Sequence, residues 1–329
     1  MPAECRNLVS NADRVTRNGS TVRRLCGYLK ERFPLVANGL LIFSFYSSNQ
    51  FLAHALTRPL APMQYDVSSL LGCTTILLFF FHMRVFDDHK DYTFDCRFFP
   101  DRVLQRGEVT LGELKILAAV AVACEFALAA ICGPAALVAI SVAFVFSLLM
   151  LKEFFVGDWL KKRFLLYASV HMLIMPLLAM TIWSFATKQY FWQIVPWYWL
   201  YSMVSYFLAF NWEVSRKIRA PEDEIDGVDS YTRLFGVYGA AYIVLFVRVV
   251  ATVLVASVAW HVGLSPWFYA MLGLLFLVCL VGFVQYRFQT SRRTAKRMEI
   301  YSGIYILAFD LALAIELGRA LGIQISGSM

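Results

Sequence analysis

The chain has 329 residues, of which 59% are hydrophobic and only 16% are charged. This composition excludes an ordinary soluble domain and is typical of a protein that crosses a membrane several times. The net charge of +7 could suit a nucleic-acid-binding protein, but the basic residues are distributed as in a membrane protein, so we expect no nucleic-acid partner.

Nine hydrophobic stretches are long enough, or nearly so, to cross a bilayer. In chain order they cover residues 34–56, 66–86, 111–132, 134–151, 164–186, 190–212, 235–260, 265–286 and 300–318. We therefore predict an all-α, polytopic membrane protein with nine transmembrane helices. Residues 1–33 would form a cytoplasmic segment, residues 34–318 one membrane domain, and residues 319–329 a short C-terminal tail.

The segment from Ser20 to Phe33 is predicted to form a short amphipathic helix, with Leu25 and Leu29 on one side and basic residues elsewhere. Such a helix can bind a membrane surface or a partner. We favour the simpler interpretation, in which it leads into the first span along the inner surface of the membrane.

The Lys and Arg residues alternate between the two sides of the predicted membrane domain. One set of segments, which includes the N-terminus, holds 26 of the 30 basic residues. The opposite side holds only Arg58, Lys188 and Arg319, and Arg248 lies within a span. The positive-inside rule therefore places the N-terminus and the charged loops in the cytoplasm, and the C-terminus on the other side.

Four aspartates follow the second hydrophobic stretch: Asp87, Asp88, Asp91 and Asp95. Steps of three and four residues return to one face of a helix, so Asp88, Asp91 and Asp95 would form a ladder with Asp87 beside it. Carboxylates this close repel each other unless a cation lies among them. Mg²⁺ fits, because it usually binds through a few carboxylates and substrate phosphates.

Basic residues surround the same acidic ladder. Arg84 and Lys90 flank it, and Arg102 and Arg106 follow one helical turn apart. Guanidinium groups bind phosphate oxygens in a bidentate manner. Carboxylates for a metal and cations for phosphate make the set that a diphosphate requires. A loop whose charges only set topology would not need this acidic spacing.

This loop resembles that of the UbiA superfamily of intramembrane prenyltransferases. The pattern Asp87-Asp88-x-x-Asp91-x-x-x-Asp95 has Asp87 where the family usually has Asn, and residues 102–107 resemble the Arg-Pro-Leu-x-x-Gly stretch that follows. The resemblance implies a nine-helix bundle with a central cavity open to the cytoplasm. It also implies that Asp87, Asp91 and Asp95 bind Mg²⁺ and an isoprenyl diphosphate, with Asp88 in support.

The loop after the sixth stretch departs from the family pattern, which usually has a second Asp-x-x-x-Asp motif. Here Glu213 is followed by Arg216, Lys217 and Arg219. We predict a catalytic and metal-binding role for Glu213, and diphosphate binding by the three cations. Fixed cations can replace a metal ion in neutralising a leaving diphosphate. The sequence therefore predicts one or two Mg²⁺ ions with a basic clamp.

Three functions remain open at this point. The first is a Mg²⁺-dependent prenyltransferase that acts on an isoprenyl diphosphate and a lipophilic, by resemblance aromatic, acceptor. The second is a terpene cyclase on the same scaffold, because Asp87-Asp88-x-x-Asp91 also matches the DDxxD pattern of class I terpene synthases. Asn211-x-x-x-Ser215 is similar to part of their second metal motif.

The third function is a membrane transporter or ion-binding protein. Glu125, Arg248, Asp310 and Glu316 lie within the predicted spans, where ionisable residues are costly and informative. We expect Arg248 to pair with one of the three acids. The acidic ladder argues against transport, because it lies at the membrane surface rather than at the midplane, where transporters bind their substrates.

Overall fold

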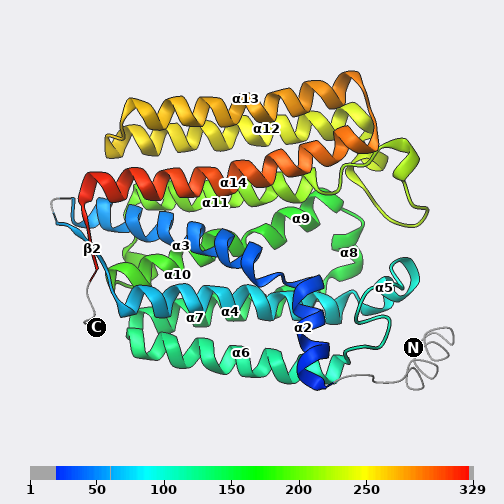
Figure 1. Cartoon of the computed structure of the whole chain (residues 1–329), viewed down its shortest axis with the longest axis horizontal. Coiled ribbons are helices and arrows are strands. Elements are labelled where there is room, and N and C mark those ends of the chain that lie inside the picture. Colours follow the sequence, from blue (N-terminus) through cyan, green and yellow to red (C-terminus); the bar gives the residue numbers. More distant parts are fainter. Residues whose placement is uncertain (1–19, 60, 326–329) are drawn as a thin grey trace.

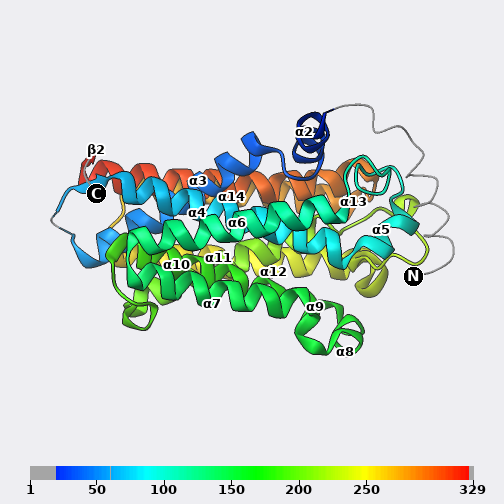
Figure 2. The same cartoon turned by 90° about the horizontal axis from the view of Figure 1, so that it is seen from below.

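The protein is a bundle of long helices that run side by side along one axis (Figures 1 and 2). The computed structural model describes residues 20–59 and 61–325. Residues 1–19 of the expected N-terminal segment and residues 326–329 of the expected tail lie outside the described residues. The predicted all-α membrane fold is confirmed.

The long helices occupy the nine predicted stretches. They are α3 (Leu35–Thr57), α4 (Val67–Lys90), α6 (Leu111–Cys132), α7 (Pro134–Leu151), the consecutive α9 (Phe164–Met172) and α10 (Ile174–Thr187), α11 (Pro196–Ser215), α12 (Tyr231–Val262), α13 (Pro266–Phe288) and α14 (Arg292–Leu321). The short elements are α2 (Thr21–Arg32), α5 (Tyr92–Phe98), α8 (Gly157–Lys161), three 3₁₀ turns at Glu153–Phe155 (η1), Phe191–Gln193 and Pro221–Asp223, and strands β1 (Met63–Tyr65) and β2 (Ile323–Ile325).

Within the described part of the chain, seven of these spans are long and apolar enough to cross a membrane, counting α9 and α10 together. Helices α3 and α11 are the two predicted spans that fall short. Buried polar residues lower the hydropathy of α3, among them Ser47, Asn49 and Gln50. These side chains point into the bundle, so a helix can be polar in sequence and still have an apolar outer surface.

Local signals set several helix ends. Asp66 and Ser69 form a capping box at the start of α4, and Thr110 and Glu113 form another at the start of α6. These pairs satisfy backbone N–H groups that have no partner within the helix. Gly263 ends α12 in the left-handed conformation, with φ of 74°, which only glycine adopts without strain.

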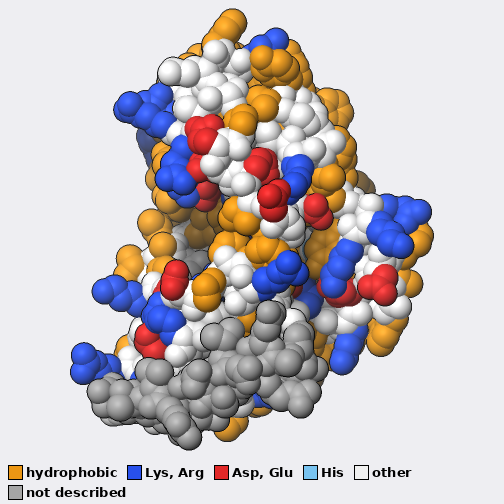
Figure 3. Space-filling model, turned by 90° about the vertical axis from the view of Figure 1, so that its right-hand side faces the viewer, with side chains coloured by type: hydrophobic (Ala, Val, Ile, Leu, Met, Phe, Trp, Pro, Cys, Tyr) orange, Lys and Arg blue, Asp and Glu red, His pale blue; other side chains and the backbone are white. Residues whose placement is uncertain are grey.

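The two ends of the bundle differ in character. At one end, β1 pairs in parallel with β2 near the C-terminus, with Met63 opposite Ile323. The other end carries α2, α5, α8 and the loop between α11 and α12 (Figure 1). Acidic and basic side chains gather on this end, among hydrophobic ones (Figure 3). The candidate site therefore lies at a single end of the bundle.

Candidate active site

Both charged loops meet at this end. Gly227, in the loop after α11, lies so close to α5 that a Cβ atom there would be 3.0 Å from the Phe98 ring. Gly227 has φ of 84°, so both its conformation and its surroundings favour glycine. The loop after α4 and the loop after α11, far apart in sequence, thus form one surface.

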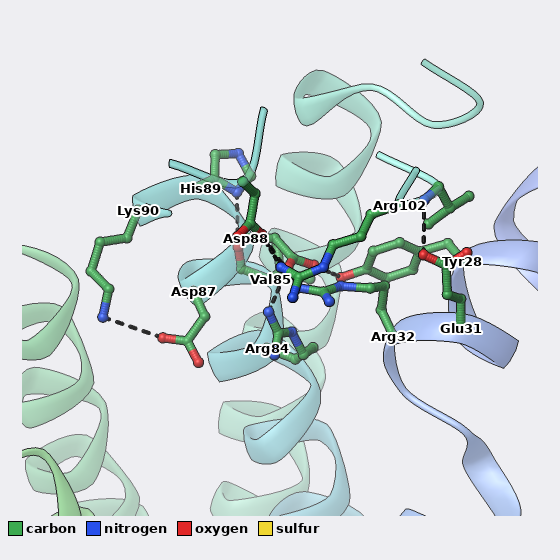
Figure 4. A network of polar contacts seen from close by, with 12 residues as sticks. Tyr28, Glu31, Arg32, Arg84, Val85, Asp87, Asp88, His89, Lys90 and Arg102 are labelled. Atoms are coloured by element: carbon green, nitrogen blue, oxygen red, sulfur yellow. Dashed lines mark hydrogen bonds and ion pairs between the residues drawn. The ribbon is translucent and has the colours of Figure 1, made fainter. Parts of the chain in front are cut away.

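The end of α4 divides its aspartates between two sides. Asp87 and Lys90 lie on one side of the helix and Asp88 lies on the other, toward α2 (Figure 4). Helix α4 ends at Lys90, and Asp91 joins it to α5. Backbone hydrogen bonds from Asp91 to Asp87 and from Asp95 to Asp91 nevertheless continue the helical spacing.

Asp88 is enclosed by hydrogen-bond donors, and its side chain is only 1% exposed. Its Oδ2 accepts from the Tyr28 hydroxyl at 2.7 Å, and its Oδ1 accepts from Arg32 at 2.5 Å and Arg84 at 2.6 Å. Burial and the Asp88 charge hold the pKa of Tyr28 far above its usual range, so the hydroxyl stays a donor. A carboxylate with three such donors has little capacity left for a metal ion.

Asp95 is also buried and also paired with arginine. It accepts a short hydrogen bond from Arg102, whose guanidinium lies 4.1 Å from the Phe99 ring centre. Arg32 approaches the same carboxylate at 3.8 Å. Arg106 points elsewhere, toward Glu108 at 2.7 Å and the backbone of the same loop. The predicted phosphate-binding residue Arg102 therefore neutralises a predicted metal ligand in this structure.

Asp87 and Asp91 have fewer partners. Lys90 lies 3.4 Å from Asp87 and 5.7 Å from the centre of the Tyr167 ring on α9. Asp91 is half-buried, and its carboxylate has no hydrogen-bond or ion-pair partner among the described residues. Burial, together with the charges of Asp87 and Asp95, raises the pKa of Asp91 above its usual range, although Lys90 opposes this. A half-buried carboxylate with no partner among the described residues is the group that a bound cation would stabilise.

The second loop has the opposite balance of charge. Glu213 is buried near the end of α11, and both Arg216 and Lys217 pair with it, the latter at 2.6 Å. The Lys217 ammonium lies 5.0 Å from the centre of the Phe164 ring. One buried guanidinium nitrogen of Arg219 has no hydrogen-bond partner among the described residues. The loop therefore offers positive charge rather than carboxylates.

Helix α9 connects the two loops. Phe164 lies under Lys217 from the second loop, and Tyr167 lies near Lys90 from the first. His171, one turn further along α9, stacks on Tyr167 with ring centres 4.1 Å apart. These aromatic residues, spaced three and four apart, form one ridge between the loops. Motif reasoning gave no signal for them, because hydrophobic spans are rich in aromatic residues whatever their role.

The arrangement of the carboxylates indicates how a metal ion could be bound. Across residues 20–59 and 61–325, no group of three His, Cys, Asp or Glu side chains is arranged to hold a metal ion. Asp87 and Asp91, four residues apart, instead offer two carboxylates. Mg²⁺ is commonly held by one or two carboxylates with substrate phosphates and water completing its shell. The residues fit an ion that arrives with a diphosphate, rather than one held in a cage of protein ligands.

An apolar cavity of 540 Å³ lies between α4, α6 and α7. Phe86, Phe126 and Phe144 form much of its wall, and His89 and Lys115 are its polar lining residues. His89 is one residue from Asp88 at the end of α4, so the cavity lies close to the acidic loop. Its walls suit a hydrocarbon chain.

The ionisable residues within the spans have separate local partners. Glu125 pairs with His82 at 2.7 Å, Asp310 accepts a hydrogen bond from Ser48, and Glu316 accepts one from a backbone N–H. The prediction that Arg248 pairs with an acid is wrong. Instead Arg248 donates to the side chain of Asn211 and lies 3.9 Å from the Tyr305 ring centre, because α11 and α14 surround it with neutral polar groups.

The same arrangement involves the residues that resemble a terpene-synthase motif. Asn211 and Ser215 are fully buried, and both are hydrogen-bonded to Ser302 on α14. They therefore stabilise helix packing inside the bundle. This position does not favour a second metal motif of the class I type.

Comparison with known proteins identifies the family. The sequence profile of the UbiA prenyltransferase family matches residues 41–305. A UbiA homolog from Aeropyrum pernix K1 superposes with a TM-score of 0.63 at 18% identity, covering 86% of this chain and 96% of that chain. A structure described as digeranylgeranylglyceryl phosphate synthase gives 0.61 at 18% identity, covering 90% and 99%.

A UbiA homolog from Archaeoglobus fulgidus bound to GPP and Mg²⁺ gives a TM-score of 0.54 at 15% identity, covering 88% of this chain and 99% of that chain. At these identities the structures establish the fold. No protein of curated function matches the chain. The profile match includes the acidic motif and most of the long helices, so the resemblance inferred from the sequence is confirmed. The chain is an integral membrane protein and belongs to the UbiA prenyltransferase family.

Proposed function

We propose that this protein is a Mg²⁺-dependent prenyltransferase that ionises an isoprenyl diphosphate and transfers the prenyl group to a lipophilic acceptor. The observation that carries the proposal is the Asp91 carboxylate, which lies near Asp87 and has no partner among the described residues, at the end of a membrane bundle where cations of two loops converge. The A. fulgidus homolog bound to GPP and Mg²⁺, or to DMAPP and Mg²⁺, supports the same substrate class.

The carboxylates of the first loop would hold the ion. Asp87 and Asp91 supply oxygen ligands directly, and Asp95 joins them when Arg102 releases it. The bound ion would neutralise charge that develops on the departing diphosphate. Asp88 supports these residues from the opposite side of α4, where its three donors keep it buried and ionised.

Arg102 would exchange partners on substrate binding. In the structure it pairs with Asp95 and lies against Phe99. A diphosphate oxygen offers the same guanidinium a second anion with matching geometry. Arg84, Lys90 and Arg106 would supply further positive charge around the phosphate groups.

The second loop would act as a basic clamp. Glu213 holds Arg216 and Lys217 in place, and one guanidinium nitrogen of Arg219 has no hydrogen-bond partner within the described part of the chain. These fixed cations stabilise the leaving diphosphate without reorganising during the reaction. Glu213 becomes a metal ligand only if those cations leave it for phosphate, so we assign it first as the residue that positions the clamp.

The prenyl chain needs an apolar site and an environment that tolerates a carbocation. We place the chain in the 540 Å³ cavity between α4, α6 and α7. The face of Tyr167, next to Lys90, is suited to an allylic cation, because aromatic rings attract positive charge. The C–O bond to the diphosphate breaks, and the acceptor supplies the electron pair for the new bond and loses a proton.

The distribution of basic residues supports a cytoplasmic site. The charged end carries the loops that the positive-inside rule assigns to the cytoplasm, and the strand pair near the C-terminus lies at the other end. An isoprenyl diphosphate would then enter from the cytoplasm, with its chain in the bilayer region of the bundle.

A terpene cyclase remains the second candidate, because ionisation would use the same residues and the cation would be captured by the substrate's own double bond. The test is to incubate purified protein with Mg²⁺ and C10, C15 or C20 prenyl diphosphates without an acceptor. Mg²⁺-dependent substrate binding without turnover supports the transferase. A cyclic hydrocarbon with stoichiometric pyrophosphate would instead establish the cyclase.

A further inference from the structure

Helix α2 crosses the end of α4 and contacts several parts of the acidic loop. Tyr28 and Arg32 both donate hydrogen bonds to Asp88 on α4 (Figure 4). Arg32 also lies 3.8 Å from the carboxylate of Asp95 on α5. Glu31 accepts a hydrogen bond from the backbone N–H of Val103 at 2.8 Å. A single short helix thus joins the segments that contain the predicted metal ligands and the predicted phosphate-binding arginines.

The spacing on α2 explains how it makes these contacts. Tyr28, Glu31 and Arg32 are three and four residues apart and lie on one face of the helix. Near the start of α2, Arg24 pairs with Glu113 at 2.7 Å and donates to the backbone carbonyl of Glu108. Because both ends of α2 are tied to other segments, the helix has a fixed position relative to α4.

Asp88 is the centre of this arrangement. Two guanidinium groups and one hydroxyl donate hydrogen bonds to its carboxylate, and the side chain is only 1% exposed. Breaking a buried ion pair by removing one partner is strongly destabilising, because the remaining charge stays buried. Asp88 therefore fixes the rotation of the last turn of α4, and with it the direction of Asp87 and Asp91 on the same turn.

We propose that Tyr28 and Arg32 are positioning residues for the metal-binding carboxylates. Through Asp88 and Asp95 they hold the end of α4 and the start of α5 in the arrangement that binds Mg²⁺ with a diphosphate. This inference rests on the proposed function. Helix α2 lies outside residues 41–305, so the family match assigns it no role.

The charge-neutral test is Tyr28→Phe, which removes one hydrogen bond to a charged group. We expect the Mg²⁺ concentration that gives half-maximal binding of a prenyl diphosphate to rise about tenfold. A change in Mg²⁺ requirement separates positioning from a loss of folded protein, which would lower the amount bound at every Mg²⁺ concentration. An unchanged Mg²⁺ requirement would overturn the role of Tyr28.

Retention of charge tests Arg32. Arg32→Gln should weaken Mg²⁺-dependent binding of a prenyl diphosphate about 10- to 100-fold, whereas Lys30→Gln, on the exposed side of α2, should stay within about twofold. Arg32→Lys, which keeps a cation beside Asp88, should recover about tenfold of the loss. The proposal fails if Arg32→Gln matches wild type, or if Arg32→Lys is no better than Arg32→Gln.

A separate measurement distinguishes this proposal from the proposed function. If the wild-type protein neither binds Mg²⁺ with inorganic pyrophosphate nor releases pyrophosphate from C10, C15 or C20 substrates, the proposed function fails, and with it the positioning role. If the wild type is active, Asp91→Asn is inactive, and Tyr28→Phe and Arg32→Gln behave as wild type, only the positioning role fails.

Discussion

The two charged loops, one after α4 and one after α11, lie at one end of the bundle but have opposite balances of charge. In the first loop, cations come to the aspartates from α2, α4 and the loop itself, and Asp91 still has no partner among the described residues. In the second loop, Glu213 is paired with two cations from its own helix end. One guanidinium nitrogen of Arg219 has no hydrogen-bond partner among the described residues. The first loop thus offers oxygen ligands, and the second offers positive charge.

The loops also share one structural feature. Asp88 in the first loop and Glu213 in the second are buried carboxylates, each paired with two basic side chains. A buried charge requires such partners, so these two acids set the directions of the cations around them. The comparison indicates that spacing alone does not identify a metal ligand. The partners decide whether a carboxylate is available.

The largest effect is expected at the carboxylates proposed to bind the metal ion. Asp91→Asn and Asp95→Asn should each reduce turnover by at least about 100-fold, because each removes a charged oxygen ligand from the site. Membrane insertion should be unchanged. The measurement is pyrophosphate release by purified variants, with Asp101→Asn, an exposed residue of the same loop, as the control. Near-normal activity in both variants would contradict the division between the loops.

Metal removal tests the same division without a substitution. Chelation should reduce turnover to background, and added Mg²⁺ should restore it. Because the described residues contain no cage of three ligands, Mg²⁺ alone should shift the thermal unfolding temperature little. Mg²⁺ with pyrophosphate should shift it by several degrees, since a ligand stabilises the state that it binds. A large shift with Mg²⁺ alone would mean that the first loop forms a complete site.

The second loop should affect substrate binding and, because its cations also stabilise the leaving diphosphate, turnover as well. Arg216→Ala combined with Lys217→Ala should raise KM for a prenyl diphosphate about 10- to 100-fold, because two charge-assisted contacts to phosphate are lost. Arg233→Gln serves as the control, since Arg233 pairs with the fully exposed Asp226 outside the clamp. Unchanged kinetics in the double variant would mean that the second loop only sets topology.

The sequence predicted the membrane fold and the position of the acidic loop well. Hydrophobic length and the Lys and Arg distribution are local properties, and so is the spacing of Asp87, Asp91 and Asp95. It could not predict which aspartate is enclosed, because the partners of Asp88 come from α2, about 60 residues earlier in the chain. Nor could it predict that α9 places Tyr167 between the two loops.

The smallest effect is expected where the second loop meets the start of α14. Arg292 donates to Asp223 at 2.8 Å on the exposed surface, and this hydrogen bond lowers the pKa of Asp223 below its usual range. The pair therefore stabilises the fold above the ordinary aspartate pKa of about 4, and its contribution is lost as pH falls through the lower pKa of the folded state. Near neutral pH Asp223 is fully ionised, so the pair adds no pH dependence to the activity there. Exposed pairs contribute little to stability, and Arg292→Gln should change KM by less than about threefold. The same is expected of Arg293→Gln, the matched control, because Arg293 has no ion-pair partner among the described residues. A larger loss in Arg292→Gln alone would show that the clamp depends on α14, and that the second loop, like the first, is positioned by a distant helix.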